Sequence, residues 1–180
     1  MSTSDAVTGY AGRRRIVVGV DGSDHSIDAL EWAAGEARAR GIALEVLTTW
    51  RYPADTLLVP VGPEPPLRSG LMQEAKSVLE RTTDKVAHAL DGLEVLPHIV
   101  EGNPSRMLIK ASEGAELLVL GKRGLGGFKG LLLGSVSQQC VAHGTCPVVV
   151  VPQHPEGAKR ISRQAEGPER SGLAPVVADV

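Results

Sequence analysis

The sequence predicts an α/β fold, a three-layer α/β/α sandwich built on a five-stranded parallel sheet. Five short apolar runs alternate along the chain with four amphipathic helical segments, and such alternation is typical of β-α-β units. Right-handed crossovers between parallel strands then restrict the topology to a doubly wound sheet. In sheets of this kind a ligand binds beyond the carboxyl ends of the strands, so the residues at those ends are the first candidates for function.

The chain opens as a β-α-β unit. The β-branched run at residues 16–20 is predicted to be a strand buried on both faces. The three arginines at residues 13–15 precede it and are expected to be a solvated entry to this strand, with their side chains in water. Asp21-Gly22-Ser23 follows and offers a turn with a capping side chain for a helix. That helix is expected to end at Gly41, and the second strand covers residues 42–50. The helix carries one apolar stripe, formed by Ile27, Leu30, Ala33, Ala34 and Ala37.

The middle of the chain is less regular. Residues 51–70 contain five prolines and are predicted to be a long loop. An amphipathic helix is expected over residues 71–90, and the third strand over residues 95–100. Gly102-Asn103-Pro104 then predicts a helix with proline at its first position, and residues 117–120 form the fourth strand.

The last helix is expected over residues 135–143, and four consecutive valines within 147–152 predict the fifth strand. Residues 1–13 are small and polar, and residues 153–180 mix charges, glycines and prolines with little periodicity. We therefore expect one domain over residues 14–152, between a flexible N-terminus and a disordered C-terminal tail.

Composition excludes several classes of protein. The 180 residues carry a net charge of −2, with 19 basic and 21 acidic side chains, which argues against a nucleic-acid partner. One Phe, two Tyr and two Trp are too few for a base-stacking platform. No signal-peptide or membrane-spanning run is present in the sequence. Cys140 and Cys146 lack partners at metal-ligand spacing and suit a reducing interior, so we expect a cytoplasmic protein without a metal site of its own.

The most informative segment is residues 121–137, directly after the fourth strand. Gly121, Gly124, Gly134 and Ser135 in this segment spell the pattern G-x2-G-x9-G-S. Glycine permits positive φ and a close approach of the backbone to a ligand, and N–H groups of such loops and of helix starts bind anions. The pattern predicts a nucleotide phosphate site, although a purely structural glycine loop is the alternative. It is neither a Walker A loop nor a G-x-G-x-x-G fingerprint.

Together with residues 16–23, Gly102-Asn103-Pro104 and the valine strand, this motif resembles the universal stress protein family over about residues 14–152. The resemblance implies a strand order of 3-2-1-4-5, a Rossmann-like arrangement of the adenine nucleotide alpha hydrolase-like type. The ATP-binding branch of the family carries this glycine loop, so the resemblance implies ATP as ligand, with any Mg²⁺ held by the phosphates. The strand at 147–152 resembles the edge through which the family forms homodimers.

The resemblance also implies roles for individual residues. Gly19 and Asp21 match positions on the adenosine side of the pocket. Thr49 matches a position that is usually small and apolar, where the backbone reads the adenine edge. Lys122 and Arg123 are candidate charges on the phosphates, and Lys129 is a weaker one. The predicted nucleotide-binding residues are Gly19, Asp21, Thr49, Gly102, Gly121, Lys122, Arg123, Gly124, Leu125, Gly126, Gly127, Gly134, Ser135, Val136 and Ser137.

Three functions remain open: an ATP-binding regulatory protein, a slow nucleotide hydrolase or transferase, and an interaction module. Hydrolysis needs a base and a positioned water, yet residues 121–137 contain no carboxylate or histidine. Asp21 and His25 could form a pair in the first helical turn, but a capping Asp and a solvated His explain both residues. We therefore expect no catalytic residues and at most a slow, incidental ATPase activity, with unknown protein partners.

Overall fold

A computed structural model describes residues 10, 12–51, 66–126 and 132–153 of the chain. The expectations for most of the N-terminal segment, for residues 52–65 and for the C-terminal tail from residue 154 lie outside the described residues.

The sheet confirms the predicted fold class. Its five strands pair in the order β3-β2-β1-β4-β5, and all four pairings are parallel. Ile16 of the central strand lies opposite Leu44 on one side and Leu117 on the other. The strands are β1 (Arg15–Gly19), β2 (Ala43–Trp50), β3 (Val95–Glu101), β4 (Leu117–Gly121) and β5 (Val148–Val151).

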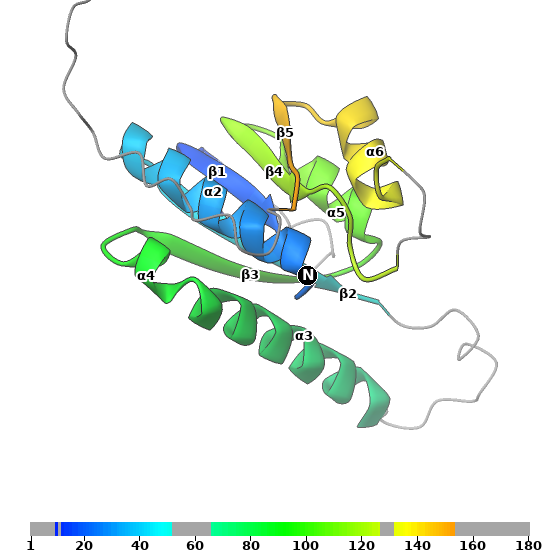
Figure 1. Cartoon of the computed structure of the whole chain (residues 1–180). Helices are drawn as coiled ribbons and strands as arrows, with labels where there is room; N and C mark the ends of the chain where they lie inside the picture. The colour runs from blue at the N-terminus through cyan, green and yellow to red at the C-terminus, as the bar shows by residue number, and fades with distance from the viewer. Residues whose placement is uncertain (1–9, 11, 52–65, 127–131, 154–180) are drawn as a thin grey trace, which may run out of the picture.

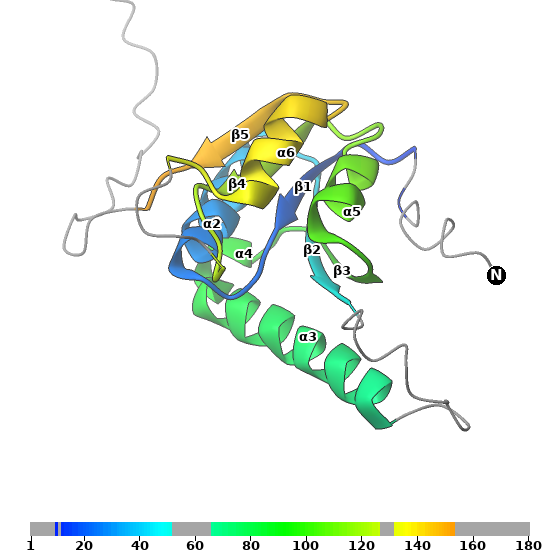
Figure 2. The same cartoon turned by 90° about the vertical axis from the view of Figure 1, so that its right-hand side faces the viewer.

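Helices cover both faces of the sheet, which makes three layers (Figures 1 and 2). One face carries α2 (Asp24–Arg40), α3 (Pro66–Lys85) and the short α4 (Ala87–Leu90). The opposite face carries α5 (Pro104–Ala111) and α6 (Ser135–His143).

Capping residues explain where two of these helices begin and where α2 ends. Ser23 caps α2 by accepting a hydrogen bond from the Ser26 N–H, and Gly41 ends the helix in the left-handed conformation with φ 62°. Asn103 caps α5 in the same way, with Pro104 in the first turn. Two helices therefore start directly after strands β1 and β3, at the edge where a ligand would bind.

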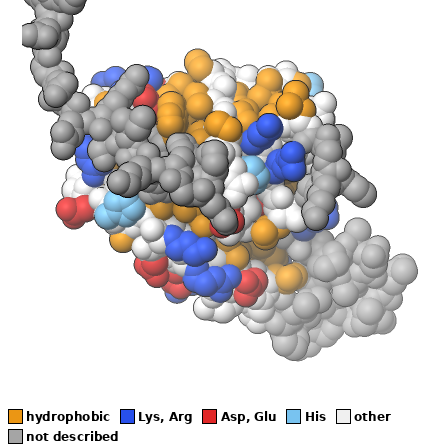
Figure 3. Space-filling view, in the orientation of Figure 1, with side chains coloured by type: hydrophobic (Ala, Val, Ile, Leu, Met, Phe, Trp, Pro, Cys, Tyr) orange, Lys and Arg blue, Asp and Glu red, His pale blue; other side chains and the backbone are white. Residues whose placement is uncertain are grey.

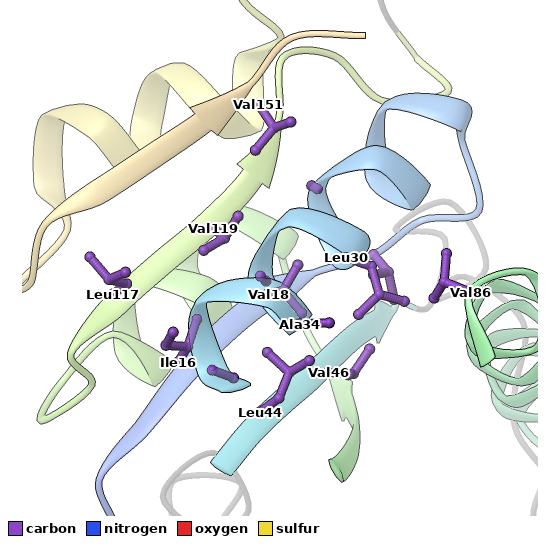
Figure 4. Close-up of a cluster of buried hydrophobic side chains, with 14 of the residues drawn as sticks. Ile16, Val18, Leu30, Ala34, Leu44, Val46, Val86, Leu117, Val119 and Val151 are labelled. Carbon is purple, nitrogen blue, oxygen red and sulfur yellow. The ribbon is translucent and has the colours of Figure 1, made fainter. Parts of the chain in front are cut away.

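The larger hydrophobic core lies between the sheet and α2 (Figure 4). Ile16, Val18, Leu44 and Val46 from the sheet meet Leu30 and alanines of α2, all without exposed surface. A second cluster, which includes Val17, Leu47, Leu108 and Cys140, fills the other face under α5 and α6. Because the central strands are buried on both faces, they read as continuous apolar runs.

The helix predicted over residues 71–90 starts too late and misses a break, although its predicted end coincides with the end of α4. The structure starts α3 at Pro66 and interrupts the helix at Val86, where φ is −118° and ψ is 21°, before α4. Proline is well tolerated in the first turn of a helix, so the last prolines of the predicted loop do not exclude a helical start. Val86 is 1% exposed, and the break places this side chain in the core.

The prediction of a solvated entry at residues 13–15 is wrong for Arg15. This side chain is 2% exposed and forms an ion pair with the equally buried Glu45. The guanidinium also donates to the carbonyl oxygen of Ala111 at the end of α5 (3.0 Å). A charged side chain at a strand start therefore belongs to the interior because β2 and α5 supply partners for it.

Candidate functional site

A pocket of about 640 Å³ lies beyond the carboxyl ends of β1, β2 and β4. This is where a doubly wound sheet places its ligand, and the volume falls within the range of small-molecule sites. The pocket brings together residues predicted from widely separated parts of the sequence. They are Gly19, Asp21, Thr49, Gly121, Arg123, Gly124, Leu125, Gly126, Gly134, Ser135, Val136 and Ser137.

Two predicted residues are placed outside the pocket lining. Gly102 follows β3, has φ 151° and donates its N–H to the Trp50 carbonyl oxygen (2.8 Å). Lys122 uses its backbone to join the loop to β5, since its N–H donates to the Val151 carbonyl oxygen (2.8 Å). Neither residue is among those that line the pocket. Gly127, like Lys129, lies outside the described residues.

The two ends of the glycine segment are fastened to each other. The Gly134 N–H donates to the Lys122 carbonyl oxygen (2.9 Å), and the Ser137 hydroxyl donates to the Gly121 carbonyl oxygen (2.8 Å). Gly134 is the N-cap of α6 and has no side chain to satisfy the first N–H groups of that helix. The start of α6 therefore presents backbone donors at the pocket.

Of the two properties that glycine offers this loop, close approach of neighbouring atoms requires it at Gly121 and Gly124, and positive φ is not used at the described positions. Gly121, Gly124, Gly126 and Gly134 are absent from the described glycines with positive φ. A Cβ at Gly121 would lie 2.6 Å from the backbone carbonyl carbon of His25 in α2. A Cβ at Gly124 would collide with a carboxylate oxygen of Asp21. Small size, rather than backbone freedom, lets the loop pack against the β1–α2 turn.

The Asp21 carboxylate connects that turn with the loop. Asp21 Oδ2 accepts a hydrogen bond from the Leu125 N–H (3.0 Å). Asp21 Oδ1 accepts from the Ser23 N–H (3.1 Å) and from the Ser23 hydroxyl (2.6 Å). The carboxylate thus holds one backbone donor of the glycine loop while it lines the pocket.

The possible Asp21–His25 pair is not formed, because Asp21 bonds to Ser23 and Leu125. Nδ1 of His25 is buried and has no hydrogen-bond partner among the described residues. Nε of Arg123 is also buried without a hydrogen-bond partner among the described residues, and Arg123 lines the pocket. Arg123 therefore offers a donor that a ligand anion could satisfy.

Sequence reasoning missed the wall that α3 contributes. Leu71, Ala75 and Val78 of α3 line the pocket, and Trp50 at the end of β2 lines it beside them. Arg68 lies over the Trp50 ring, 5.6 Å from its centroid, and pairs with Glu101 at 2.8 Å. The i, i+4, i+7 spacing of the three α3 residues already marked a buried stripe, and the alternation of β2 places Thr48 and Trp50 on that side of the sheet. These two signals together could have identified the wall.

The charged groups of the lining are few and balanced. Asp21, Glu74, Arg51 and Arg123 are the charged residues of the lining. Glu74 also pairs with Arg81, which is not among the lining residues (3.1 Å). No group of three or more His, Cys, Asp or Glu side chains among the described residues could hold a metal ion.

Cys140 of α6 lies in the core, and burial raises the pKa of its thiol from 9.0 to about 11. In the same described ranges, no helix is long and apolar enough to cross a membrane.

The fold and the pocket define a doubly wound α/β protein with a pocket at the carboxyl edge of its sheet. The family model for the universal stress protein family matches residues 12–152, and the chain belongs to this family. A universal stress protein of Mycobacterium tuberculosis is 31% identical over 180 residues, which cover 91% of this chain and 57% of the relative. One from Thermus aquaticus is 35% identical over 145 residues, 77% of this chain and 98% of the relative. The chain thus spans little more than half the length of the mycobacterial relative.

Solved structures share the fold. A universal stress protein in complex with cAMP superimposes with a TM-score of 0.61 at 23% identity, covering 80% of this chain and 100% of that one. A family protein from Arabidopsis thaliana with AMP bound gives a TM-score of 0.54 at 21% identity, with 82% and 97% covered.

Proposed function

We propose that the chain is a nucleotide-dependent regulatory protein of the stress response that binds ATP in this pocket. The observation that supports the proposal most is the convergence of the glycine segment with the ends of β1 and β2 on one pocket of about 640 Å³. Proteins of the same fold are described with cAMP and with AMP bound, which favours an adenine nucleotide as the ligand class.

The proposed ligand lies with its adenosine near Gly19, Asp21 and Thr49. Its phosphates lie along the glycine loop and the start of α6, where the Ser135 hydroxyl adds to uncapped N–H groups. The Ser137 hydroxyl instead holds the loop through the Gly121 carbonyl oxygen. Arg123 contributes positive charge, and a Mg²⁺ ion would be held mainly by the phosphates. Lys122, which does not line the pocket, is proposed only as an outer contact. Gly127 stays, as predicted, in the loop that wraps the ribose and phosphates.

Binding without turnover is favoured over hydrolysis. A hydrolase needs a free base within reach of a water, and the Asp21 carboxylate is engaged by Ser23 and Leu125. ATPase activity would therefore be slow and incidental. We place this function in the cytoplasm because both cysteines are free thiols.

A homodimer through β5 accompanies this function in our proposal. The strand pairs with β4 on one side only in the described sheet, and an unpaired edge invites another strand. Apolar side chains gather on the side of the molecule where Figure 1 draws β5 and α6 (Figure 3). Val141 of α6 is 52% exposed, so α6 also offers an apolar side chain to solvent.

Two measurements on the purified protein test the function. The nucleotide retained by the protein as isolated from cells identifies the ligand, and labelled ATP shows binding followed by any release of phosphate. We expect an adenine nucleotide to be retained and phosphate release to be negligible over the binding experiment. Rapid turnover would support the hydrolase alternative, whereas failure to bind any adenine nucleotide would leave an interaction module with a structural loop.

A further inference from the structure

The end of β3 holds Trp50 of β2 at two points. Trp50 lies opposite Glu101 in the parallel pairing of the two strands. The Gly102 N–H donates to the Trp50 carbonyl oxygen (2.8 Å), which fixes the backbone. Glu101 pairs with Arg68 of α3 (2.8 Å), and the Arg68 guanidinium lies over the indole ring, 5.6 Å from its centroid. A cation over the face of a tryptophan ring is attracted to it, so the side chain is held as well.

Only glycine suits position 102 in this arrangement. Gly102 has φ 151°, a conformation that L side chains rarely adopt. A Cβ there would lie 2.9 Å from Cγ and Sδ of Met107 in α5. Gly102 therefore serves the pocket from outside its lining, by letting the chain turn after β3 while its N–H stays bonded to Trp50.

The indole is the part of this arrangement that reaches the pocket. Trp50 lines the pocket, whereas the residues that hold it do not. It follows Thr49, near which the adenosine of the proposed ligand lies. Three apolar residues of α3 line the pocket as well: Leu71, Ala75 and Val78. An aromatic ring that is fixed in place offers a flat apolar surface, and every nucleobase has a flat face that can stack on such a surface.

We propose that Trp50 recognises the flat face of the ligand's base, and that Arg68 is a positioning residue that acts through the indole without touching the ligand. The inference rests on the proposed function for its nucleotide, and it adds a side-chain contact to the base end of the pocket. Stacking depends on the planar base and not on the phosphates. The affinity that Trp50 supplies is therefore the same for adenosine and for ATP.

The contact can be observed directly by fluorescence, because the chain has only one other tryptophan, Trp32. Trp32 belongs to α2, is 38% exposed and does not line the pocket, so Trp32→Phe leaves Trp50 as the single indole. This variant is titrated with adenosine, ATP and inorganic tripolyphosphate, with excitation where adenine does not absorb. We expect adenosine and ATP to quench the emission of Trp50 and tripolyphosphate to leave it unchanged.

Calorimetry on variants measures what the contact contributes. Trp50→Leu keeps an apolar side chain but removes the flat ring, and it should bind adenosine and ATP roughly tenfold more weakly than wild type. Arg68→Gln should weaken both ligands by about two- to fivefold and change the emission of Trp50 in the ligand-free Trp32→Phe background. Arg68→Lys retains the positive charge and should recover part of the affinity. Lys76→Gln is the matched control and should bind as wild type, because Lys76 pairs with Glu80 on the same helix outside the pocket lining.

Two results separate this inference from the proposed function. If adenosine binds but leaves the emission of Trp50 unchanged, or binds a folded Trp50→Leu as tightly as wild type, the base contact is refuted while the proposed function stands. If no adenosine compound binds, the proposed function fails, and guanosine, cytidine and uridine are titrated instead. Quenching of Trp50 by any of these nucleosides supports its contact with a base, and quenching by none refutes it.

The role of Arg68 has its own test. Arg68→Gln binding as tightly as wild type, or Arg68→Lys binding as weakly as Arg68→Gln, overturns the positioning role. If Trp50→Leu does not fold, the emission titration decides on the base contact, since it keeps Trp50 in place.

Discussion

Nε of Arg15 lies 2.6 Å from Oε2 of Glu45, and the two side chains are only 2% and 1% exposed. The pair joins the start of β1 to β2, and the other carboxylate oxygen of Glu45 lies 2.6 Å from Nδ1 of His98 in β3. The carbonyl oxygen of Ala111 adds the end of α5. One buried charged cluster thus ties three strands and a helix together at the edge of the sheet opposite the pocket.

Removing Arg15 should therefore destabilise the fold while leaving the pocket intact. Arg15→Met leaves Glu45 buried without its guanidinium, and we expect a loss of about 3–5 kcal/mol in the free energy of unfolding, measured in urea. Arg14→Met is the matched control, because Arg14 pairs with Glu116 while 74% exposed and its removal should cost less than about 1 kcal/mol. Equal losses in the free energy of unfolding for the two variants would show that the buried pair stabilises the fold no more than the exposed pair.

The phosphate role of the loop is tested at Gly134. Gly134→Asp places a carboxylate at the N-cap of α6, where aspartate is a favoured residue, so the variant should fold. That carboxylate would occupy the helix N–H groups and repel phosphate. With ATP at a hundredfold excess over the wild-type Kd, wild type should gain about 2.7 kcal/mol, and a tenfold weaker variant only about 1.4 kcal/mol, in a thermal shift assay.

Gly134→Ala is the control for this substitution. Its Cβ would lie 3.4 Å from Cα of Arg123, an ordinary contact, and it adds no charge, so it should keep most of the ligand stabilisation. Gly121→Ala is unsuitable as a second probe of the loop because its Cβ would meet the His25 backbone at 2.6 Å. Undiminished stabilisation of Gly134→Asp by ATP would argue against a phosphate site in this loop.

Local patterns were sufficient for most of the fold and much of the pocket lining. Apolar runs and caps predict the strands, whereas their order was implied only by the resemblance to the family. The strand ends at Asp21, Thr49 and Gly121 were expected to meet at one edge of a parallel sheet. Partners distant in sequence were not predictable in this way. From the sequence alone Arg15 resembles a surface residue, because its partner Glu45 is distant in the chain. No local pattern predicts the hydrogen bond between Leu125 and Asp21 either. Prolines before α3 concealed its start because proline is typical both of loops and of first helical turns.

The buried thiol of Cys140 predicts a loss of stability in alkali. Its pKa is raised from 9.0 to about 11 by burial, so the folded chain keeps this proton where the unfolded chain releases it. The contribution to stability is complete below about pH 9 and falls as pH rises toward 11, by up to about 1.4 kcal/mol per pH unit. Urea unfolding of wild type and Cys140→Ala from about pH 8 to about pH 10 should show their difference in stability shrinking above pH 9. A difference independent of pH would mean that the thiol ionises equally in both states.

The proposed dimer depends on which backbone groups of β5 are free. The carbonyl oxygens of Pro147 and Val151 accept hydrogen bonds from Leu118 and Lys122. Because backbone groups alternate along a strand, Val149 also points its N–H and C=O toward β4, whereas Val148 and Val150 point theirs outward. Replacing Val149 and Val151 with lysine would be a poor test of the dimer. Val151 is 4% exposed, so a lysine at this position would disrupt the core as well as any dimer.

Val150→Pro is therefore the sharper test of a dimer formed by pairing of two β5 strands. It removes one outward N–H and leaves the bonds to β4 in place, and proline is tolerated at an edge whose N–H faces away from the sheet. We expect wild type to sediment as a dimer at micromolar concentration and Val150→Pro as a folded monomer. Val149→Pro is the matched control, since it removes an inward N–H and should lower the unfolding midpoint more. A wild-type monomer, or a Val150→Pro dimer as tight as wild type, would contradict pairing through this edge.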